Sequence, residues 1–163
     1  SGEIGHFPLL NNDQICHCGK TGCLETGASG SAAYRIFMEK LNEGRTSTLS
    51  EKFNKGAQIH IEDIIDAVRE EDVLAIEVIE EIGTTLGRAI AGLINLFNPE
   101  LIVIGGSIAS TKEYLLLPIK SAIQKHSLNI INSDTSIKFS KLGKRAGAIG
   151  SCMLGRSKFL GLL

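Results

Sequence analysis

The most informative stretch of this chain reads CHCGKTGCLE at residues 16–25, with the shorter sequence GEIGH ahead of it at residues 2–6. Cys16, Cys18 and Cys23 form a Cys-x-Cys-x4-Cys run, and His6 stands ten residues before the first cysteine. Three thiols and one imidazole are a complete tetrahedral ligand set for zinc, and a set with no place left for water is typical of a structural site. We therefore predict a zinc loop over residues 6–25.

Other interpretations of these donors stay open from the residues alone. The cysteines could be buried apolar residues or a disulfide pair, although three within eight positions, separated by glycines, favour a metal. His17 could replace His6 as the fourth donor, but adjacent ligands would strain the chelate. Cys152 stands alone in a helical stretch of small residues, where we expect a buried core thiol.

Two carboxylates flank the expected ligands. Glu3 precedes His6 by three residues, and Glu25 follows Cys23 by two. Because a filled four-ligand site has no place for them, both carboxylates are free to accept hydrogen bonds from a polyhydroxylated molecule such as a sugar. The alternative is a pair of ordinary solvated carboxylates, and the local sequence does not separate the two.

Together, GEIGH and the CxCGxxGCLE run resemble the signature of the ROK family, which is named for its repressors, open reading frames and kinases. The sequence IVIGG at residues 102–106 is similar to the family's glycine turn on the adenosine side, and AGAIG at residues 146–150 is similar to the start of its last helix. The resemblance implies an α/β chain that forms most of the C-terminal lobe of the actin-like, ribonuclease H-like ATPase fold. It further implies a single domain over residues 1–163, with the zinc loop inserted.

The resemblance also implies roles for individual residues. The implied ligands of a structural zinc ion are His6, Cys16, Cys18 and Cys23. The implied contacts to a sugar or amino sugar are Glu3, His6 and Glu25. His6 would serve both, because a ring nitrogen that is not bound to zinc carries a proton and can donate it to a sugar oxygen. Gly105 and Gly106 are candidate nucleotide contacts, although a Gly-Gly turn alone is weak evidence.

The sequence before residue 1 would normally carry the parts that separate the family's branches. Kinases of the family resemble one another in a phosphate loop and an Asn-Asp pair, and its repressors carry a winged helix-turn-helix; none of these is present here. Phosphoryl transfer needs metal-bound phosphates and a base beside the nucleophile, so we expect this chain alone to be inactive as a kinase. With a net charge of −1 and scattered basic residues, it would contact DNA only through a missing N-terminal domain.

Two departures from the kinase pattern favour the regulator branch. Ser107 stands where kinases commonly have a third glycine, and Lys144-Arg145 lies near the place of an acidic or asparagine residue. We therefore interpret the chain as the sugar-sensing C-terminal portion of a ROK transcriptional regulator, similar to repressors of N-acetylglucosamine or xylose use. The alternatives are the C-terminal portion of an ATP- and Mg-dependent ROK hexose kinase, and a zinc-stapled structural lobe that binds no ligand.

Length, composition and periodicity complete the expectations. The chain has 163 residues, 43% of them hydrophobic, and no apolar run approaches the ~20 residues that span a bilayer. Clustered thiols favour a reducing compartment, so we expect a cytoplasmic protein without membrane contact. A sheet edge exposed by missing strands, and the apolar chain end at 159–163, favour either a homodimer or docking on the missing lobe.

Apolar spacing predicts the individual elements. Helices are expected over residues 28–41, 61–69, 73–97, 114–126 with a break or restart at Pro118, and 146–160. A buried parallel strand is expected over residues 101–104, a second strand over 136–142, and a surface loop over 44–56. Glycines 83, 87 and 92 in the longest helix predict a closely approaching neighbour, because glycine costs a helix about 1 kcal/mol relative to alanine.

Overall fold

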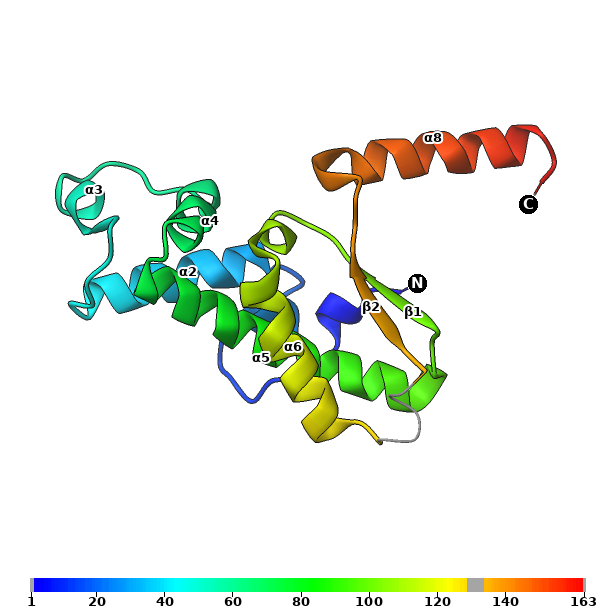
Figure 1. Cartoon of the computed structure of the whole chain (residues 1–163), viewed down its shortest axis with the longest axis horizontal. Helices are drawn as coiled ribbons and strands as arrows, with labels where there is room; N and C mark the ends of the chain where they lie inside the picture. Colours follow the sequence, from blue (N-terminus) through cyan, green and yellow to red (C-terminus); the bar gives the residue numbers. More distant parts are fainter. Residues whose placement is uncertain (1, 129–133, 163) are drawn as a thin grey trace.

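Helices surround a core built on one long helix, as the computed structural model shows for residues 2–128 and 134–162 (Figure 1). The helices are α1 (Glu25–Ala28), α2 (Gly30–Asn42), α3 (Ser50–Asn54), α4 (Ile61–Arg69), α5 (Val73–Phe97), α6 (Glu113–His126) and α8 (Ala146–Phe159). The strands are β1 (Leu101–Ile104) and β2 (Ser136–Phe139), and the short 3-10 helices are η1 (Ile4–His6), η2 (Ile108–Thr111) and η3 (Gly143–Arg145). Mixed helix and sheet agrees with the α/β class predicted from the sequence.

The longest helix, α5, lies at the centre of the core. Its observed bounds are those predicted from the apolar spacing. The carboxylate of Asp72 caps the first turn by accepting a hydrogen bond of 2.8 Å from the N–H of Ala75, and Asn98 ends the helix in the left-handed conformation. Helices α2, α4 and α6 pack against α5 and bury its apolar stripe. The core is therefore mainly a helix-on-helix interface.

Two glycines let α6 approach α5 closely. A Cβ atom on Gly83 would lie 2.6 Å from Cγ of Pro118, and one on Gly87 would lie 2.7 Å from Cβ of Ala122. Since close-packed carbon atoms do not approach so near, glycine is required at this contact. The predicted close approach is confirmed at these two positions, whereas no heavy atom of the described neighbours lies within 4 Å of the Cβ position of Gly92.

The sheet in the described residues consists of β1 and β2, paired in parallel with Leu101 opposite Ser136. Both strands were predicted, but the second ends at Phe139 rather than at residue 142. The expectation that β1 is buried was wrong for half of its side chains. Ile104 is buried and Ile102 packs against the core, whereas Leu101 and Val103 are 49% and 57% exposed. Side chains alternate between the two faces of a strand, so one face contacts the helical core and the other is uncovered.

Two predictions of irregular structure were wrong. The polar stretch 44–56 contains the helix α3, and both Phe53 of this helix and the preceding Leu49 pack against the core. Helix α6 runs through Pro118 without interruption. Proline removes one backbone donor from a helix, and here the proline ring packs closely against α5 at Gly83.

Helix α8 stands apart from the core (Figure 1) and buries none of its residues. Its bounds were predicted to within one residue, but the prediction that Cys152 is a core thiol was wrong, because the helix that carries it does not pack on the core. Phe159 is 91% exposed. What covers this apolar end stays a prediction. Among the described residues, none of the helices has both the length and the apolar sequence needed to traverse a bilayer.

Candidate metal centre

The backbone of residues 8–23 folds into a tight loop that fixes the spacing of the cysteines. The N–H of Leu10 donates to the carbonyl of Gly22 at 2.9 Å, and the N–H of Cys16 donates to that of Lys20 at 2.8 Å. Gly22 has a φ of 75°, and a Cβ atom there would lie 2.6 Å from the carbonyl oxygen of Leu10. Only glycine fits this conformation and this approach. Gly22 therefore permits the tight turn just before Cys23.

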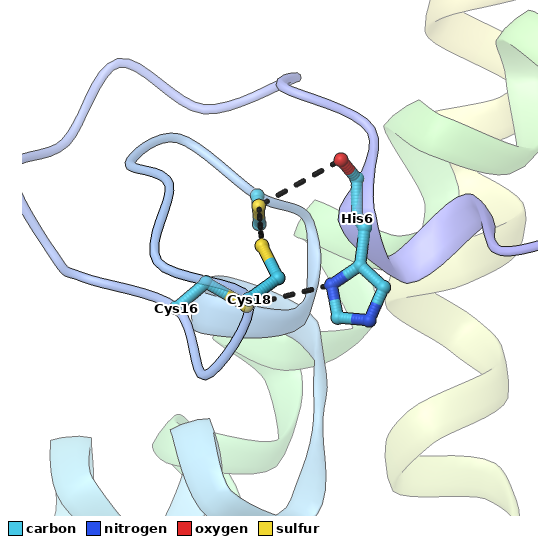
Figure 2. Close-up of side chains that lie close together, drawn as sticks. His6, Cys16 and Cys18 are labelled. Carbon is cyan, nitrogen blue, oxygen red and sulfur yellow. Dashed lines mark hydrogen bonds between the residues drawn. The ribbon is translucent and has the colours of Figure 1, made fainter.

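The four expected metal ligands converge at one end of this loop (Figure 2). Their ligand atoms all lie within 4.8 Å of one another, and the cluster consists of His6, Cys16, Cys18 and Cys23. Nδ1 of His6 is 3.5 Å from Sγ of Cys16, and the Sγ atoms of Cys18 and Cys23 are 3.5 Å apart. Zinc–sulfur bonds of about 2.3 Å imply tetrahedral edges of about 3.8 Å, so this donor set fits a tetrahedral zinc ion.

The structure does not match the other interpretations of these donors that the sequence left open. His17 is not a member of the cluster. The two closest sulfur atoms stand well beyond the ~2.05 Å of a disulfide bond, and the cysteines are free. Cys16 and Cys23 are buried, but beside two further donors rather than in an apolar core. Of the arrangements considered, a four-donor cluster with His6 matches the structure.

The local surroundings shift two of the thiols in opposite directions. A hydrogen bond from the backbone of Lys20 lowers the pKa of the Cys18 thiol to about 7. Burial raises the pKa of the Cys23 thiol to about 11. Metals bind thiolates. The Cys18 thiol is partly ionised at neutral pH, whereas the Cys23 thiol is protonated and must lose its proton when a metal binds.

The imidazole of His6 faces two ways. Nδ1 points toward the sulfur cluster, and Nε2 lies 4.0 Å from a carboxylate oxygen of Glu3, whose side chain is 79% exposed. The sequence left open which nitrogen faces the ligand set, and the structure assigns Nδ1. A metal on Nδ1 would leave the proton on Nε2, on the side where Glu3 lies.

Glu25 approaches the same turn from α1. It is the first residue of that helix and half-buried, and its Oε2 lies 3.1 Å from the position that a Cβ atom on Gly5 would take. The carboxylates of Glu3 and Glu25 therefore both border the turn η1. A cavity of about 140 Å³ adjoins Glu25 and is also lined by Cys16, His17 and Arg35.

The polar side chains around α1 were not among the predicted site residues. Arg35 donates to the carbonyl oxygen of Thr26 at 3.0 Å and to both carboxylate oxygens of Glu39 at 2.8 Å. The spacing of Arg35 and Glu39 on one helix could have suggested an ion pair. The bond to Thr26 has no sequence signal, because the acceptor is a backbone atom.

The candidate nucleotide contacts lie at the carboxyl end of β1, where ligands of open α/β sheets bind. Gly106 has a φ of 96° and borders a cavity of about 320 Å³ that is also lined by Glu62, Asp66 and Gly143. Oγ of the adjoining Ser107 lies 3.6 Å from the Cβ position of Gly30. The glycine turn thus adjoins the start of α2, which the single residue Ser29 separates from the end of α1.

Comparison with known proteins gives concordant matches. The ROK family model matches residues 1–158. A glucokinase from Halalkalibacterium halodurans is 38% identical over 151 residues, which are 92% of this chain and 46% of that protein. The Escherichia coli dual regulator NagC and N-acetylglucosamine repressor are each 35% identical over 162 residues, which are 99% of this chain and 39% of those proteins. The chain thus spans less than half the length of these relatives.

A solved structure agrees with this picture. The ROK family glucokinase from Streptomyces griseus, in complex with glucose and AMPPNP, matches the fold with a TM-score of 0.79 and 26% sequence identity. The match covers 93% of this chain and 50% of that one. Both repressors and kinases are therefore among the relatives of this chain.

Proposed function

The chain belongs to the ROK family, and from this we propose that it is a sugar-binding portion of a ROK protein, in which Glu3, His6 and Glu25 hold a hexose or an amino sugar. We propose further that residues 1–163 form one domain, most of the C-terminal lobe of an actin-like ATPase fold, with the metal loop at residues 6–25 inserted. The relatives named for glucose and for N-acetylglucosamine support this class of ligand.

One observation carries the proposal: the two nitrogens of the His6 ring face different partners. Nδ1 faces the cysteines, while Nε2 faces Glu3 at 4.0 Å. Zinc held by the four clustered donors would supply structural order and a fixed tautomer. With Nε2 protonated, His6 can donate to a sugar oxygen while the neighbouring carboxylates accept from sugar hydroxyls. Such a set of one donor and two acceptors suits a polyhydroxylated ligand.

Within the family, we propose a transcriptional regulator that senses the sugar. Ser107 and the Lys144-Arg145 pair depart from the kinase pattern, and the repressor relatives cover 99% of this chain. In a regulator, the sugar must bind two conformations with different affinity, and DNA would be bound through a domain outside this chain. We propose that this regulator is a homodimer in the cytoplasm.

A ROK sugar kinase is the second candidate. The glucokinase relative is 38% identical, and Gly106 borders a cavity beside the start of α2 that could accept a nucleotide. In this case ATP with Mg²⁺ would bind at Gly105 and Gly106, and the base for phosphoryl transfer would come from outside this chain. Zinc would have the same structural role in both candidates.

Calorimetric titration of the intact protein tests the sugar site. Glucose and N-acetylglucosamine are titrated into the wild type and into a Glu3→Gln, Glu25→Gln double variant. We expect one sugar to bind the wild type and to bind the variant at least about tenfold more weakly, because two charge-assisted acceptors are lost. If neither sugar binds the wild type, the sugar site is wrong and the structural-lobe alternative stands.

An ATP-consumption assay separates the two branches. We expect the intact protein to bind its sugar without sugar-dependent hydrolysis or transfer from ATP, as a regulator would. Sugar-dependent consumption of ATP with formation of a sugar phosphate would instead establish the kinase candidate and exclude the regulator. Holding sugar and Mg²⁺ at saturating concentrations ensures that the lack of turnover does not reflect an empty site.

A further inference from the structure

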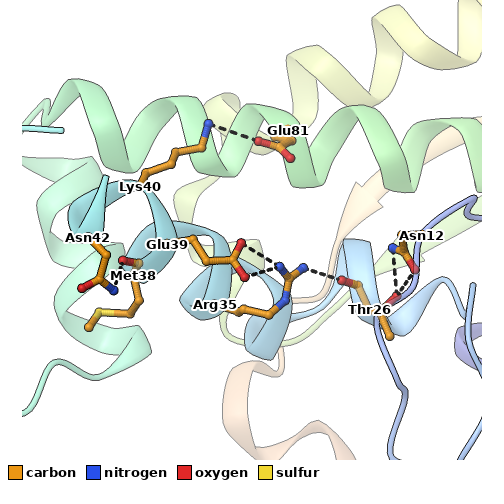
Figure 3. Close-up of polar contacts among 8 residues, drawn as sticks. All are labelled: Asn12, Thr26, Arg35, Met38, Glu39, Lys40, Asn42 and Glu81. Carbon is orange, nitrogen blue, oxygen red and sulfur yellow. Dashed lines mark hydrogen bonds and ion pairs between the residues drawn. The ribbon is translucent and has the colours of Figure 1, made fainter. Parts of the chain in front are cut away.

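We propose that Arg35 is a positioning residue for the sugar contact of Glu25, which it holds in place through the backbone of α1. This inference rests on the proposed sugar site and adds to it a side chain from α2. Arg35 acts through Thr26, the residue that follows Glu25, and does not itself need to touch the sugar. Figure 3 shows Arg35 between Glu39 and Thr26.

Helix α1 cannot hold its own shape. It has four residues, and a single helical turn is unstable in water because nucleation fixes several residues for very few hydrogen bonds. The carbonyl groups at the end of a helix also lack partners within it. The direction of the Glu25 side chain therefore depends on groups outside α1.

Ser29, the N-cap of α2, and Arg35 of α2 supply those partners. The hydroxyl of Ser29 donates to the carbonyl oxygen of Glu25 at 2.7 Å, and Nη2 of Arg35 donates to that of Thr26 at 3.0 Å. Both bonds anchor consecutive peptide units at the residue that bears the carboxylate. The guanidinium bond involves a charged donor and is therefore the stronger type.

The guanidinium group is itself held in a fixed orientation. Its Nη1 donates to both carboxylate oxygens of Glu39 at 2.8 Å, one turn further along α2. The side chain of Arg35 is 32% exposed, so solvent reaches this ion pair only in part. Nη1 and Nη2 are both engaged with protein acceptors, so the guanidinium group is held between Glu39 and the backbone of α1.

The other end of α1 is tied to the metal loop. The carbonyl oxygen of Cys23, a cluster residue, accepts hydrogen bonds from the N–H of Thr26 at 3.0 Å and from its hydroxyl at 2.8 Å. Nδ2 of Asn12 donates to the same hydroxyl at 3.3 Å. Glu25 thus lies between Cys23 and Thr26, which are bonded to each other. Arg35 adds a bond from Thr26 to α2.

The test compares Arg35→Met with Lys40→Met in the intact protein. Lys40 lies on the same helix and pairs with Glu81 of α5 at 3.5 Å, so its variant removes a cation without touching α1 (Figure 3). We expect Arg35→Met to weaken the binding of the sugar identified for the wild type by about tenfold. Lys40→Met should bind within about twofold of the wild type, because the Lys40–Glu81 pair joins α2 to α5 and makes no bond to α1.

A double-variant cycle separates positioning from general destabilisation. In a Glu25→Gln background, Arg35→Met should weaken sugar binding by less than about twofold, because the carboxylate that it positions is already gone. A merely structural role would give the full tenfold loss again. Zinc content and circular dichroism should match the wild type, and if Arg35→Met fails to fold, Arg35→Lys replaces it and should give a smaller loss with the same dependence on Glu25.

Two results would overturn the inference in different ways. In the first, Arg35→Met binds the sugar as tightly as the wild type does, or Arg35→Met weakens binding by the full tenfold in the Glu25→Gln background as well. Either outcome refutes the role of Arg35 and leaves the sugar site intact. In the second, the wild type binds neither glucose nor N-acetylglucosamine, which refutes the proposed site and this inference together.

Discussion

The metal loop at residues 6–25 and the contact between α5 and α6 are ordered in contrasting ways. In the loop, Phe7 and Ile15 are 56% and 77% exposed, and the buried side chains are those of Cys16, Cys23 and Leu24. At the helix contact, Ile82 and Ile119 are almost fully buried, and two glycines remove all space between the backbones. The loop therefore depends on its donors, and the helix pair depends on packing. Each region should respond to a perturbation that leaves the other unchanged.

The largest expected effect is that of metal removal on the loop. Structural zinc contributes roughly 10 kcal/mol or more to small sites, and little apolar burial would remain in the metal loop without it. After chelation, we expect amide exchange to become fast in the loop while α5 stays protected, as measured by hydrogen–deuterium exchange. Any sugar affinity should fall as well, because Glu3 and Glu25 border the loop. Equal loop protection before and after verified metal removal would refute this division.

Gly87→Ala perturbs the helix contact instead. The added Cβ would lie 2.7 Å from both Cβ of Ala122 and the carbonyl oxygen of Ile119, so we expect a loss of about 2 kcal/mol in the free energy of unfolding. Gly92→Ala is the matched control on the same helix, and it should be neutral or more stable by up to about 1 kcal/mol. Urea denaturation measures both. Equal effects of the two substitutions would mean that the contact is not closely packed.

Asp72 connects the start of α5 to the preceding segment, and its loss should have a smaller effect. Its carboxylate accepts hydrogen bonds from the N–H groups of Ala75 and Thr48 at 2.8 and 2.6 Å. Asp72→Ala should lower the free energy of unfolding by about 1–2 kcal/mol, because the helix loses its cap. Zinc content should not change. A zinc-depleted Asp72→Ala protein would show that the two regions are coupled.

The smallest expected effect is the acid dependence contributed by Asp72. Burial opposes its ionisation, but hydrogen bonds from the backbone of Thr48 and Ala75 outweigh burial and lower its pKa. A lowered pKa in the folded state stabilises the protein above the ordinary value of about 3.9, and this stabilisation is lost as the pH falls through the folded value. The stability difference between wild type and Asp72→Asn should therefore shrink below about pH 4. A difference that grows on acidification would contradict the sign.

The features that could be predicted from the sequence are those set by residues close together along the chain. The bounds of α4 and α5 followed from apolar spacing, and the gathering of His6 with three cysteines followed from their separation along the chain. Features that depend on distant packing were missed. Cys152 has the small, apolar neighbours of a core residue but lies on a helix that no described element covers, and Arg35 has a backbone acceptor that no side-chain pattern reveals.

X-ray absorption spectroscopy of the purified intact protein tests the central claim directly, because it reports the element bound and its nearest atoms. We predict one zinc ion per chain with three sulfur atoms at about 2.3 Å and one nitrogen atom at about 2.0–2.1 Å. A His6→Ala variant should lose the nitrogen signal, whereas His17→Ala should keep it. Protein that carries no stoichiometric metal, or a metal whose nitrogen signal survives the loss of His6, would contradict the account.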